Sequence, residues 1–198
     1  MPNIALAILA HPDDAEFLCA GTLLRLKREA GWTVHIATMT AGDCGSAEFA
    51  PEAIAAIRRG EGLAACETVG FRNHCLGILD LRVQFCDAQL DMVTRLIQKV
   101  NPAIVFTHSP EDYHLDHEQT SRLVRAATFA APIPNFLHRP GHVEGHPPLG
   151  AIPHTYYCDP LEGKDQFGRE IPPSFRVNIT SAIDVIFKSE KRGGFEIG

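Results

Sequence analysis

Short apolar runs alternate along the chain with longer segments in which apolar residues recur at helical spacing. Residues 4–10 are apolar without interruption, which is typical of a strand covered on both faces of a sheet. β-Branched residues are frequent at 33–40, and another apolar run occupies 104–107, so two further strands are predicted there. Shorter strand candidates lie at 74–76, 154–158 and 175–178.

Helical periodicity fills the intervals between these strands. Apolar residues between positions 90 and 100 follow one another by three or four positions, which places them on one face of a helix. Asn101-Pro102 ends this helix, because the residue before a proline avoids helical backbone angles. Gly31 and Gly70 are natural helix stops. Helices are therefore predicted at 15–30, 51–69, 90–100 and 116–130, with a partial helix after Thr180.

This alternation of strand and helix predicts the class of fold. A strand, a helix and a second parallel strand form a right-handed crossover in nearly all proteins. Repeated units of this kind build a parallel sheet with helices on both faces. We therefore expect an α/β protein with a Rossmann-like, doubly wound and mostly parallel sheet, forming a single domain over residues 1–198.

Residues 131–153 break the alternation. Six prolines and three glycines in this segment oppose any regular element and predict a long ordered loop. Four histidines lie in or beside the loop, namely His138, His142, His146 and His154. We favour a substrate lid or a contact between subunits, because the prolines and glycines oppose the helix that would make the histidine spacing suit a metal.

Composition and charge narrow the classes of function. Hydrophobic residues make up 45% of the 198 residues and charged residues 21%, as in ordinary folded proteins. The net charge of −6 disfavours binding to nucleic acid or to an anionic membrane. The apolar run at 4–10 is too short to span a bilayer, and no basic segment precedes it. The six cysteines form no Cys-x-x-Cys pair, which argues against a zinc knuckle or a thioredoxin-like motif, and without a recognisable signal peptide we expect reduced thiols in a cytoplasmic protein.

Two polar clusters directly follow predicted strands. The run HPDD at 11–14 comes after the first strand, and HSPEDYHLDH begins at the end of the fourth and covers 108–117. The carboxyl ends of parallel strands share one rim, so the clusters face each other if the two strands are neighbours. Imidazole and carboxylate together suit Zn²⁺ among other divalent metals, and a catalytic zinc keeps one position for water. Taken singly, the aspartates are equally well explained as helix caps, and the histidine pair as a solvated turn.

These clusters carry a resemblance to a known family. The runs AHPDDAEFLCAGTL at 10–23 and THSPEDYHLDHEQ at 107–119 resemble the PIG-L/LmbE family of zinc-dependent deacetylases. The stretches at 40–49, 55–71 and 175–186 are also similar to that family. Its members remove acetyl groups from N-acetylglucosaminyl conjugates. The resemblance therefore implies a small N-acetylated sugar conjugate as substrate, and a homo-oligomer.

The resemblance also implies a role for each matching residue. His11, Asp14 and His117 would bind Zn²⁺, with Fe²⁺ as the alternative ion, and Asp13 would be the general base. Two adjacent aspartates on a turn point in different directions, so one is able to ligate while the other reaches the metal-activated water. His114 would stabilise the oxyanion as a cationic imidazole and protonate the leaving amine.

Three weaker candidates for substrate binding lie on the same predicted rim. Gly42 would let the backbone approach a substrate, although an ordinary turn explains it equally well. Its loop lacks the GxxxxGK[ST] pattern of a phosphate loop. Arg58 would lie near the substrate, or form a surface ion pair with Glu61 one helical turn away. Asp80 would bind sugar hydroxyls or serve as a turn residue.

Functions from three classes are compatible with these residues. The leading one is hydrolysis by metal-activated water, removing the acetyl group from an N-acetylglucosaminyl conjugate or a related N-acyl amine. An amidase of thiol conjugates would use the same metal site. A non-catalytic nucleotide-binding module would have the same fold, but the GxGxxG pattern is absent after the first strand. His108, beside the second cluster, has no role that the sequence assigns.

Overall fold

A five-stranded parallel sheet forms the centre of the molecule, in the order β3-β2-β1-β4-β5. The computed structural model describes residues 2–136 and 146–186. From β1 the chain moves outward to one edge of the sheet and then to the other, as in doubly wound folds, so the expected α/β class is confirmed. The strands are β1 (Ile4–Leu9), β2 (Thr33–Thr40), β3 (Arg72–Ile78), β4 (Ile104–His108) and β5 (His154–Cys158).

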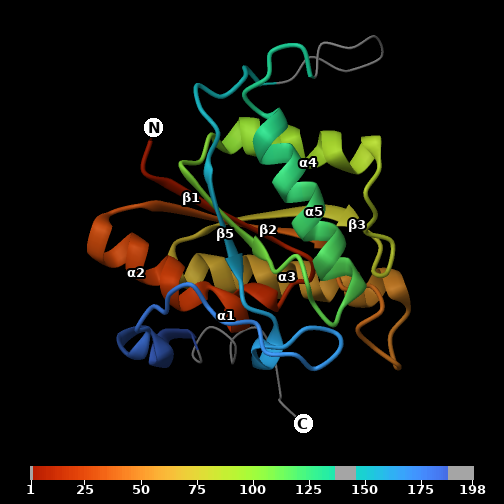
Figure 1. Ribbon diagram of the computed structural model, residues 1–198. Coiled ribbons are helices and arrows are strands. Elements are labelled where there is room, and N and C mark those ends of the chain that lie inside the picture. The colour runs from red at the N-terminus through yellow and green to blue at the C-terminus, as the bar shows by residue number, and fades with distance from the viewer. Residues whose placement is uncertain (1, 137–145, 187–198) are drawn as a thin grey trace.

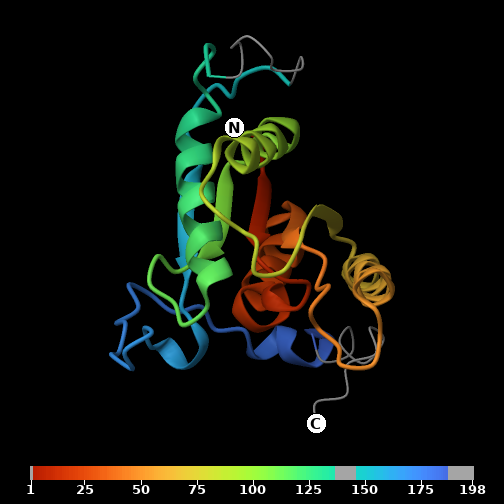
Figure 2. The same ribbon diagram turned by 90° about the vertical axis from the view of Figure 1, so that its right-hand side faces the viewer.

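Helices cover both faces of this sheet. α4 and α5 lie on one face, and α1, α2 and α3 lie on the other (Figure 1). The view turned by 90° shows α5 and α3 on opposite sides of β1 and β4 (Figure 2). The helices are α1 (Asp14–Leu18), α2 (Ala20–Ala30), α3 (Pro51–Val69), α4 (Asp87–Val100) and α5 (Leu115–Ala130), followed by the 3₁₀ turns η1 (Leu161–Gly163) and η2 (Thr180–Ala182).

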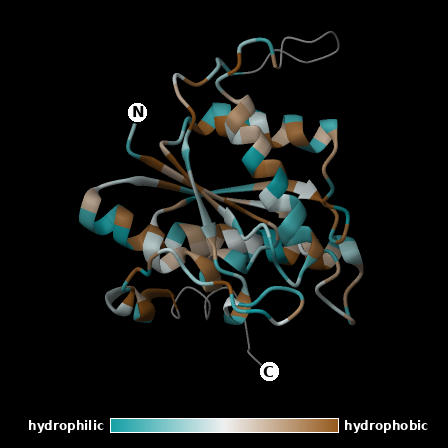
Figure 3. Cartoon of the chain, viewed as in Figure 1, coloured by the Kyte–Doolittle hydropathy of each residue, from teal (hydrophilic) through white to brown (hydrophobic). Residues whose placement is uncertain are grey.

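The side chains of β1 show why its sequence is apolar throughout. Successive residues of a strand point to opposite faces of the sheet. Leu6 and Ile8 pack beneath α4 and α5, whereas Ala7 and Leu9 pack against α1 and α2 on the other face. All four side chains are fully buried, and β1 is coloured as hydrophobic along its length in Figure 3. A strand with both faces covered has no position left for a solvated residue.

The helix predicted at 15–30 consists of two helices that meet at Cys19. This residue has φ −145° and ψ −6°, which lie outside the helical region. The apolar pattern nevertheless continues across the break, because Ala15 and Leu23 pack in the same hydrophobic cluster. Helical spacing reports which side of a segment is buried, so it did not reveal the break.

The strand predicted at 175–178 is wrong. Within the described residues the sheet ends at β5, and 175–178 has no strand partner. The carbonyl oxygen of Asn178 instead accepts a hydrogen bond of 2.9 Å from Arg25 Nη1 of α2. Ile179 packs so closely on Gly21 that a Cβ at Gly21 would come within 2.7 Å of it. This segment is therefore fixed by side-chain contacts with α2, which strand propensity does not report.

Two other predictions differ in extent or are only partly described. β3 is longer than the predicted 74–76, because the polar residues that begin it still pair with β2. The predicted loop at 131–153 is described at 131–136 and 146–153, and those parts contain no helix or strand. His138 and His142 lie outside the described residues, so the lid or subunit contact stays a prediction. No helix in the described ranges is long and apolar enough to cross a membrane.

Replacing Ile97 by Ala tests how strongly α4 is held by the sheet. Ile97 is fully buried in the cluster that contains Leu6 and Val105. The cavity left by the smaller side chain should lower the free energy of unfolding by about 2–5 kcal/mol. Met92→Ala, at an exposed position of the same helix, should lower it by less than about 1 kcal/mol. Urea denaturation followed by circular dichroism measures both, and equal losses would contradict the assigned packing.

Candidate metal centre

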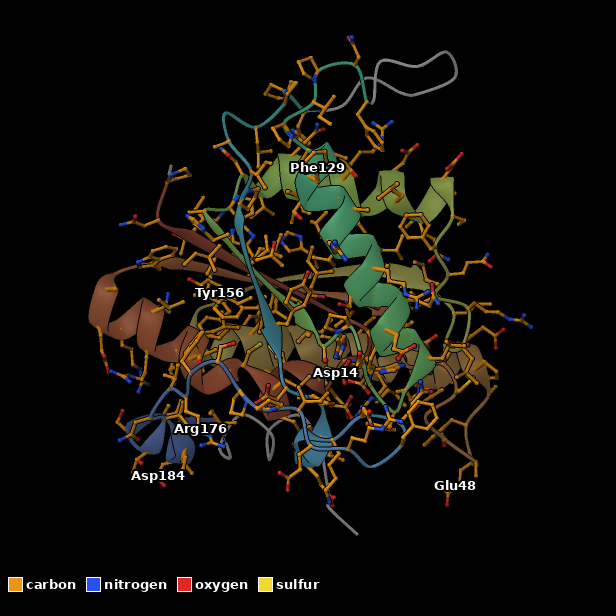
Figure 4. All side chains as sticks on the ribbon, viewed as in Figure 1. Asp14, Glu48, Phe129, Tyr156, Arg176 and Asp184 are labelled. Carbon is orange, nitrogen blue, oxygen red and sulfur yellow. The ribbon has the colours of Figure 1, made fainter. Side chains whose placement is uncertain are left out.

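The pairing of β1 with β4 brings the two polar clusters together. Leu6 of β1 lies opposite Val105 of β4 in a parallel register, so both strands deliver their carboxyl ends to the same rim. The run 11–14 and the run 112–117 therefore meet where the strand order reverses, as expected. In Figure 4, Asp14 lies at this end of the molecule and Phe129 at the other end of α5.

Three side chains point their polar atoms at one another. His11 Nδ1 lies 3.2 Å from His117 Nε2 and 3.5 Å from Asp14 Oδ2. His117 Nε2 also lies 3.4 Å from Asp14 Oδ1. Two nitrogens and a carboxylate at this spacing form a group that is able to hold a metal ion. The three residues that the family resemblance singled out are thus brought together.

Each of the two histidines has a carboxylate behind it. His117 Nδ1 lies 3.1 Å from Asp112 Oδ1, and His11 Nε2 lies 3.3 Å from Asp116 Oδ2. Such contacts fix the orientation of a ring and direct its other nitrogen at a metal. Asp112 and Asp116 are both buried. The sequence analysis did not assign these two residues. Their position in the second cluster, close in sequence to the candidate ligand histidine, is the signal that could have identified them.

Without a metal, the surroundings shift the pKa values of the three grouped residues. Burial would raise the pKa of Asp14, but contacts with the surrounding histidines hold it well below its usual range. Burial would lower the pKa of His117, but Asp112 and Asp14 outweigh it and raise that pKa to about 9. The pKa of His11 is also raised, because Asp14 outweighs burial. The centre therefore attracts positive charge, which protons supply here and a metal cation would replace.

His108 forms the inner wall of the centre. It is fully buried, and its ring stacks on that of His117 with the centroids 3.9 Å apart and the planes within 8°. Its Nε2 lies 3.1 Å from Asp14 Oδ2. Burial lowers the pKa of His108, despite the neighbouring Asp14. The residue for which the sequence assigned no role therefore contacts two of the three grouped residues.

The side chain of Asp13 has a different partner from that of Asp14. Its Oδ2 lies 3.1 Å from Arg58 Nη2 of α3, and Arg58 Nη1 lies 3.4 Å from Glu61 Oε2. Asp13 belongs to none of the metal-holding groups, but it lines the same cavity. Arg58 therefore pairs with Glu61, as one alternative expected, and also lies beside the candidate base, while its contact with a substrate stays a prediction.

His114 is neutral in this arrangement. Its Nδ1 accepts a hydrogen bond of 3.2 Å from the backbone N–H of Asp116, capping α5. An accepting Nδ1 carries no proton, so Nε2 carries it. Burial, with the nearby His11 and His117, lowers the pKa of His114. The expectation of a cationic imidazole is corrected by this geometry, because the capping bond requires the neutral ring.

Two loops complete the rim on the side of β2 and β3. Asp80 Oδ2 accepts a hydrogen bond of 2.8 Å from Cys44 N, and Asp80 N donates one of 2.7 Å to Asp43 Oδ1. Gly42 has φ +74°, and a Cβ there would lie 3.3 Å from Pro12 Cγ. Together with the metal-holding residues, Gly42, Arg58 and Asp80 line one cavity of about 560 Å³.

The chain belongs to a known family. Residues 6–128 match the PIG-L family, described as GlcNAc-PI de-N-acetylase. That stretch makes up more than half of the chain and contains both polar clusters. The family match therefore includes both segments that supply the residues of the metal-holding group.

A named relative and two solved structures are similar to the chain. A probable N-acetyl-α-D-glucosaminyl L-malate deacetylase 2 of Bacillus cereus is 34% identical over 141 residues, which cover 67% of this chain and 64% of that protein. The matched segment thus spans less than two thirds of the length of this curated relative.

N,N′-diacetylchitobiose deacetylase from Pyrococcus horikoshii has a solved structure with a TM-score of 0.83 at 22% identity, covering 98% of this chain and 72% of its own. GalB, the 4-carboxy-2-hydroxymuconate hydratase of Pseudomonas putida, has a TM-score of 0.78 at 24% identity, covering 97% and 78%. At these identities the two structures show a shared fold alone.

Replacing Asp112 by Asn tests whether this carboxylate orients His117. The variant keeps all three grouped residues but weakens the charged contact to His117 Nδ1. We expect the affinity for a divalent metal such as Zn²⁺ to fall by about 10–100-fold. Competition with a coloured chelator measures the affinity. Glu111→Gln removes an exposed charge next to it in the chain and serves as the control; an equal loss in both variants would contradict the orienting role.

Proposed function

We propose that this protein is a zinc-dependent hydrolase that removes the acetyl group from an N-acetylglucosaminyl conjugate. One observation carries the proposal: His11 Nδ1 and His117 Nε2 lie 3.2 Å apart, and each lies 3.4–3.5 Å from one of the two carboxylate oxygens of Asp14. A tetrahedral Zn²⁺ with bonds of about 2.0–2.1 Å needs ligand atoms roughly 3.3 Å apart. Three protein ligands beside an open cavity leave the fourth position for water.

The bound metal would supply two effects, a lowered pKa of the attacking water and polarisation of the amide carbonyl. Asp13 is the base that takes the proton of that water. Its carboxylate lines the cavity and contacts Arg58 at 3.1 Å, which orients it. A positioned base of this kind is worth about 10²–10⁴-fold in rate.

His114 is the second group that acts on the substrate. Its Nδ1 is occupied by the capping bond, so its Nε2–H is the group available to the cavity that it lines. A neutral imidazole in this state donates a hydrogen bond to the carbonyl oxygen as negative charge develops there. The proton that Asp13 takes from the water is then passed to the leaving nitrogen, whose release as an amine completes the cleavage.

The proposed substrate follows from the family and the relatives. The matched family is described by removal of an N-acetyl group from a glucosaminyl lipid, and the Bacillus cereus relative by its action on a glucosaminyl conjugate. Arg58 and Asp80 are the polar side chains on the β2 and β3 side of the cavity, where they would bind sugar hydroxyls. A thiol-conjugate amidase would use the same centre, and assays of N-acetylglucosaminides beside S-conjugates separate the two. The homo-oligomer stays a prediction for sedimentation to test.

Replacing Asp13 by Asn tests the base. The amide keeps the size of the side chain but cannot accept the water proton, so we expect acetate release to fall by about 10²–10⁴-fold. Elemental analysis should show that the metal content is unchanged, since Asp13 is outside the ligand group. Asp159→Asn, at an exposed aspartate after β5, is the matched control. Full turnover in a folded Asp13→Asn protein would eliminate the assignment.

Metal binding should depend on pH with a known sign. The pKa of His117 is about 9 without metal, so the ring is charged below that pH and the metal must displace its proton. The apparent affinity for Zn²⁺ should therefore weaken by about tenfold for each unit of pH lost between about pH 8 and 6, and by more where His11 also releases a proton. Chelator competition measures the slope. His154→Gln, far from the ligand group in the chain, should leave it unchanged, and an affinity independent of pH would contradict the ligand set.

A further inference from the structure

The two sides of the cavity differ in chemistry. The sheet order places the loops after β2 and β3, together with α3, on one side of β1, and the loops after β4 and β5 on the other. Arg58 and Asp80 line the first side. Tyr113 and Leu161 line the second, where Phe17 of α1 joins them. The first side therefore carries Arg58 and Asp80 together with the exposed Leu81, and the second carries three large hydrophobic side chains, with the metal centre between them.

The apolar side consists of large side chains that stay open to solvent. Phe17 is 60% exposed, Tyr113 57% and Leu161 60%. They come from three separate segments, and the η1 turn that carries Leu161 follows the carboxyl end of β5 (Figure 1). Single exposed hydrophobic residues are common on protein surfaces, but three that converge on one cavity form a patch that a ligand is able to cover.

Tyr113 places this patch beside the rings of His114 and His117 at the centre. The ring of Tyr113 meets that of His117 edge to face, with centroids 5.7 Å apart and planes at 77°. It meets the ring of His114 in the same way, at 5.9 Å and 89°. A group attached close to the amide of a bound substrate would therefore reach the apolar side.

The apolar side of the cavity has no lysine or arginine among its described lining residues. Among the lysines and arginines of the described residues, only Arg58 lines the cavity, and it lies between Asp13 and Glu61. The carboxylates of Asp13, Asp80 and Asp112 line it as well. An anionic aglycone such as malate would therefore find no lysine or arginine of the described residues beside Phe17, Tyr113 and Leu161 to pair with.

We propose that the substrate carries an apolar aglycone, which packs against Phe17, Tyr113 and Leu161 while its sugar occupies the side of Arg58 and Asp80. This inference rests on the proposed function for the sugar and the acetyl group. Apolar surface that leaves water on binding supplies the affinity. The specificity for the aglycone therefore comes from the α1, β4 and β5 side of the cavity.

Binding of two glycosides that cannot be deacetylated tests the inference separately from turnover. Hexyl and methyl β-glucosaminide carry the free amine and differ only in the aglycone. Titration calorimetry on the zinc-loaded protein should show hexyl glucosaminide binding at least about tenfold tighter. Leu161→Ser and Phe17→Ser should each reduce that preference severalfold while leaving the affinity for methyl glucosaminide unchanged. Phe167→Ser, 70% exposed and outside the cavity, is the matched control and should keep the preference.

The outcomes separate this inference from the proposed function. Equal affinities for the two glycosides, or a preference that survives both variants, would overturn the apolar aglycone even if the enzyme releases acetate from methyl N-acetylglucosaminide. A preference lost in both variants supports it even if no acetate is released. A dimer dispersed by Leu161→Ser without any preference for the hexyl group would instead assign the patch to a second copy of the chain. N-Hexanoylglucosamine, bound more tightly than hexyl glucosaminide, would assign the patch to the acyl group and likewise overturn the inference.

Discussion

The buried carboxylate of Asp14 is the interaction on which the rest of the site depends. A charge removed from water is costly unless hydrogen bonds or opposite charges compensate it. The backbone N–H of His11 donates to Asp14 Oδ2 at 2.7 Å, and three imidazole rings surround the carboxylate. Those rings come from β4 and α5 as well as from the loop after β1. The pairing of β1 with β4 and the compensation of this charge are therefore two aspects of one constraint.

Alternation of charge extends outward from that carboxylate. Asp112 and Asp116 lie behind the two rings, so each imidazole is held between acidic groups. Asp116 also accepts a hydrogen bond of 2.7 Å from Leu81 N and lies in the first turn of α5, where a negative charge is favourable. Three carboxylates around two rings create a place for positive charge. Protons that occupy it take up the lone pairs of the imidazole nitrogens, and a divalent cation would bind to those same lone pairs in place of the protons.

The fold itself leaves the chemistry open. A deacetylase and a hydratase both share it with this chain at high TM-scores and low identity. Function on such a scaffold resides in the side chains that the loops bring to the rim. Here the candidate base beside Arg58 and the neutral His114 fit the proposed amide hydrolysis, and the exposed aromatic and aliphatic side chains line the part of the cavity where the aglycone is proposed to bind.

The sequence by itself determined the sheet, the helices on both faces and the two polar clusters that meet at its rim, because apolar runs and the position of HPDD after β1 are local properties. Family resemblance was needed to choose ligands among the histidines and aspartates. Tertiary structure decided the rest. The break at Cys19 and the irregular path of 175–178 depend on contacts with distant segments. So do the roles of Asp112, Asp116 and His108 and the neutral state of His114, since each is set by a partner whose distance the sequence does not encode.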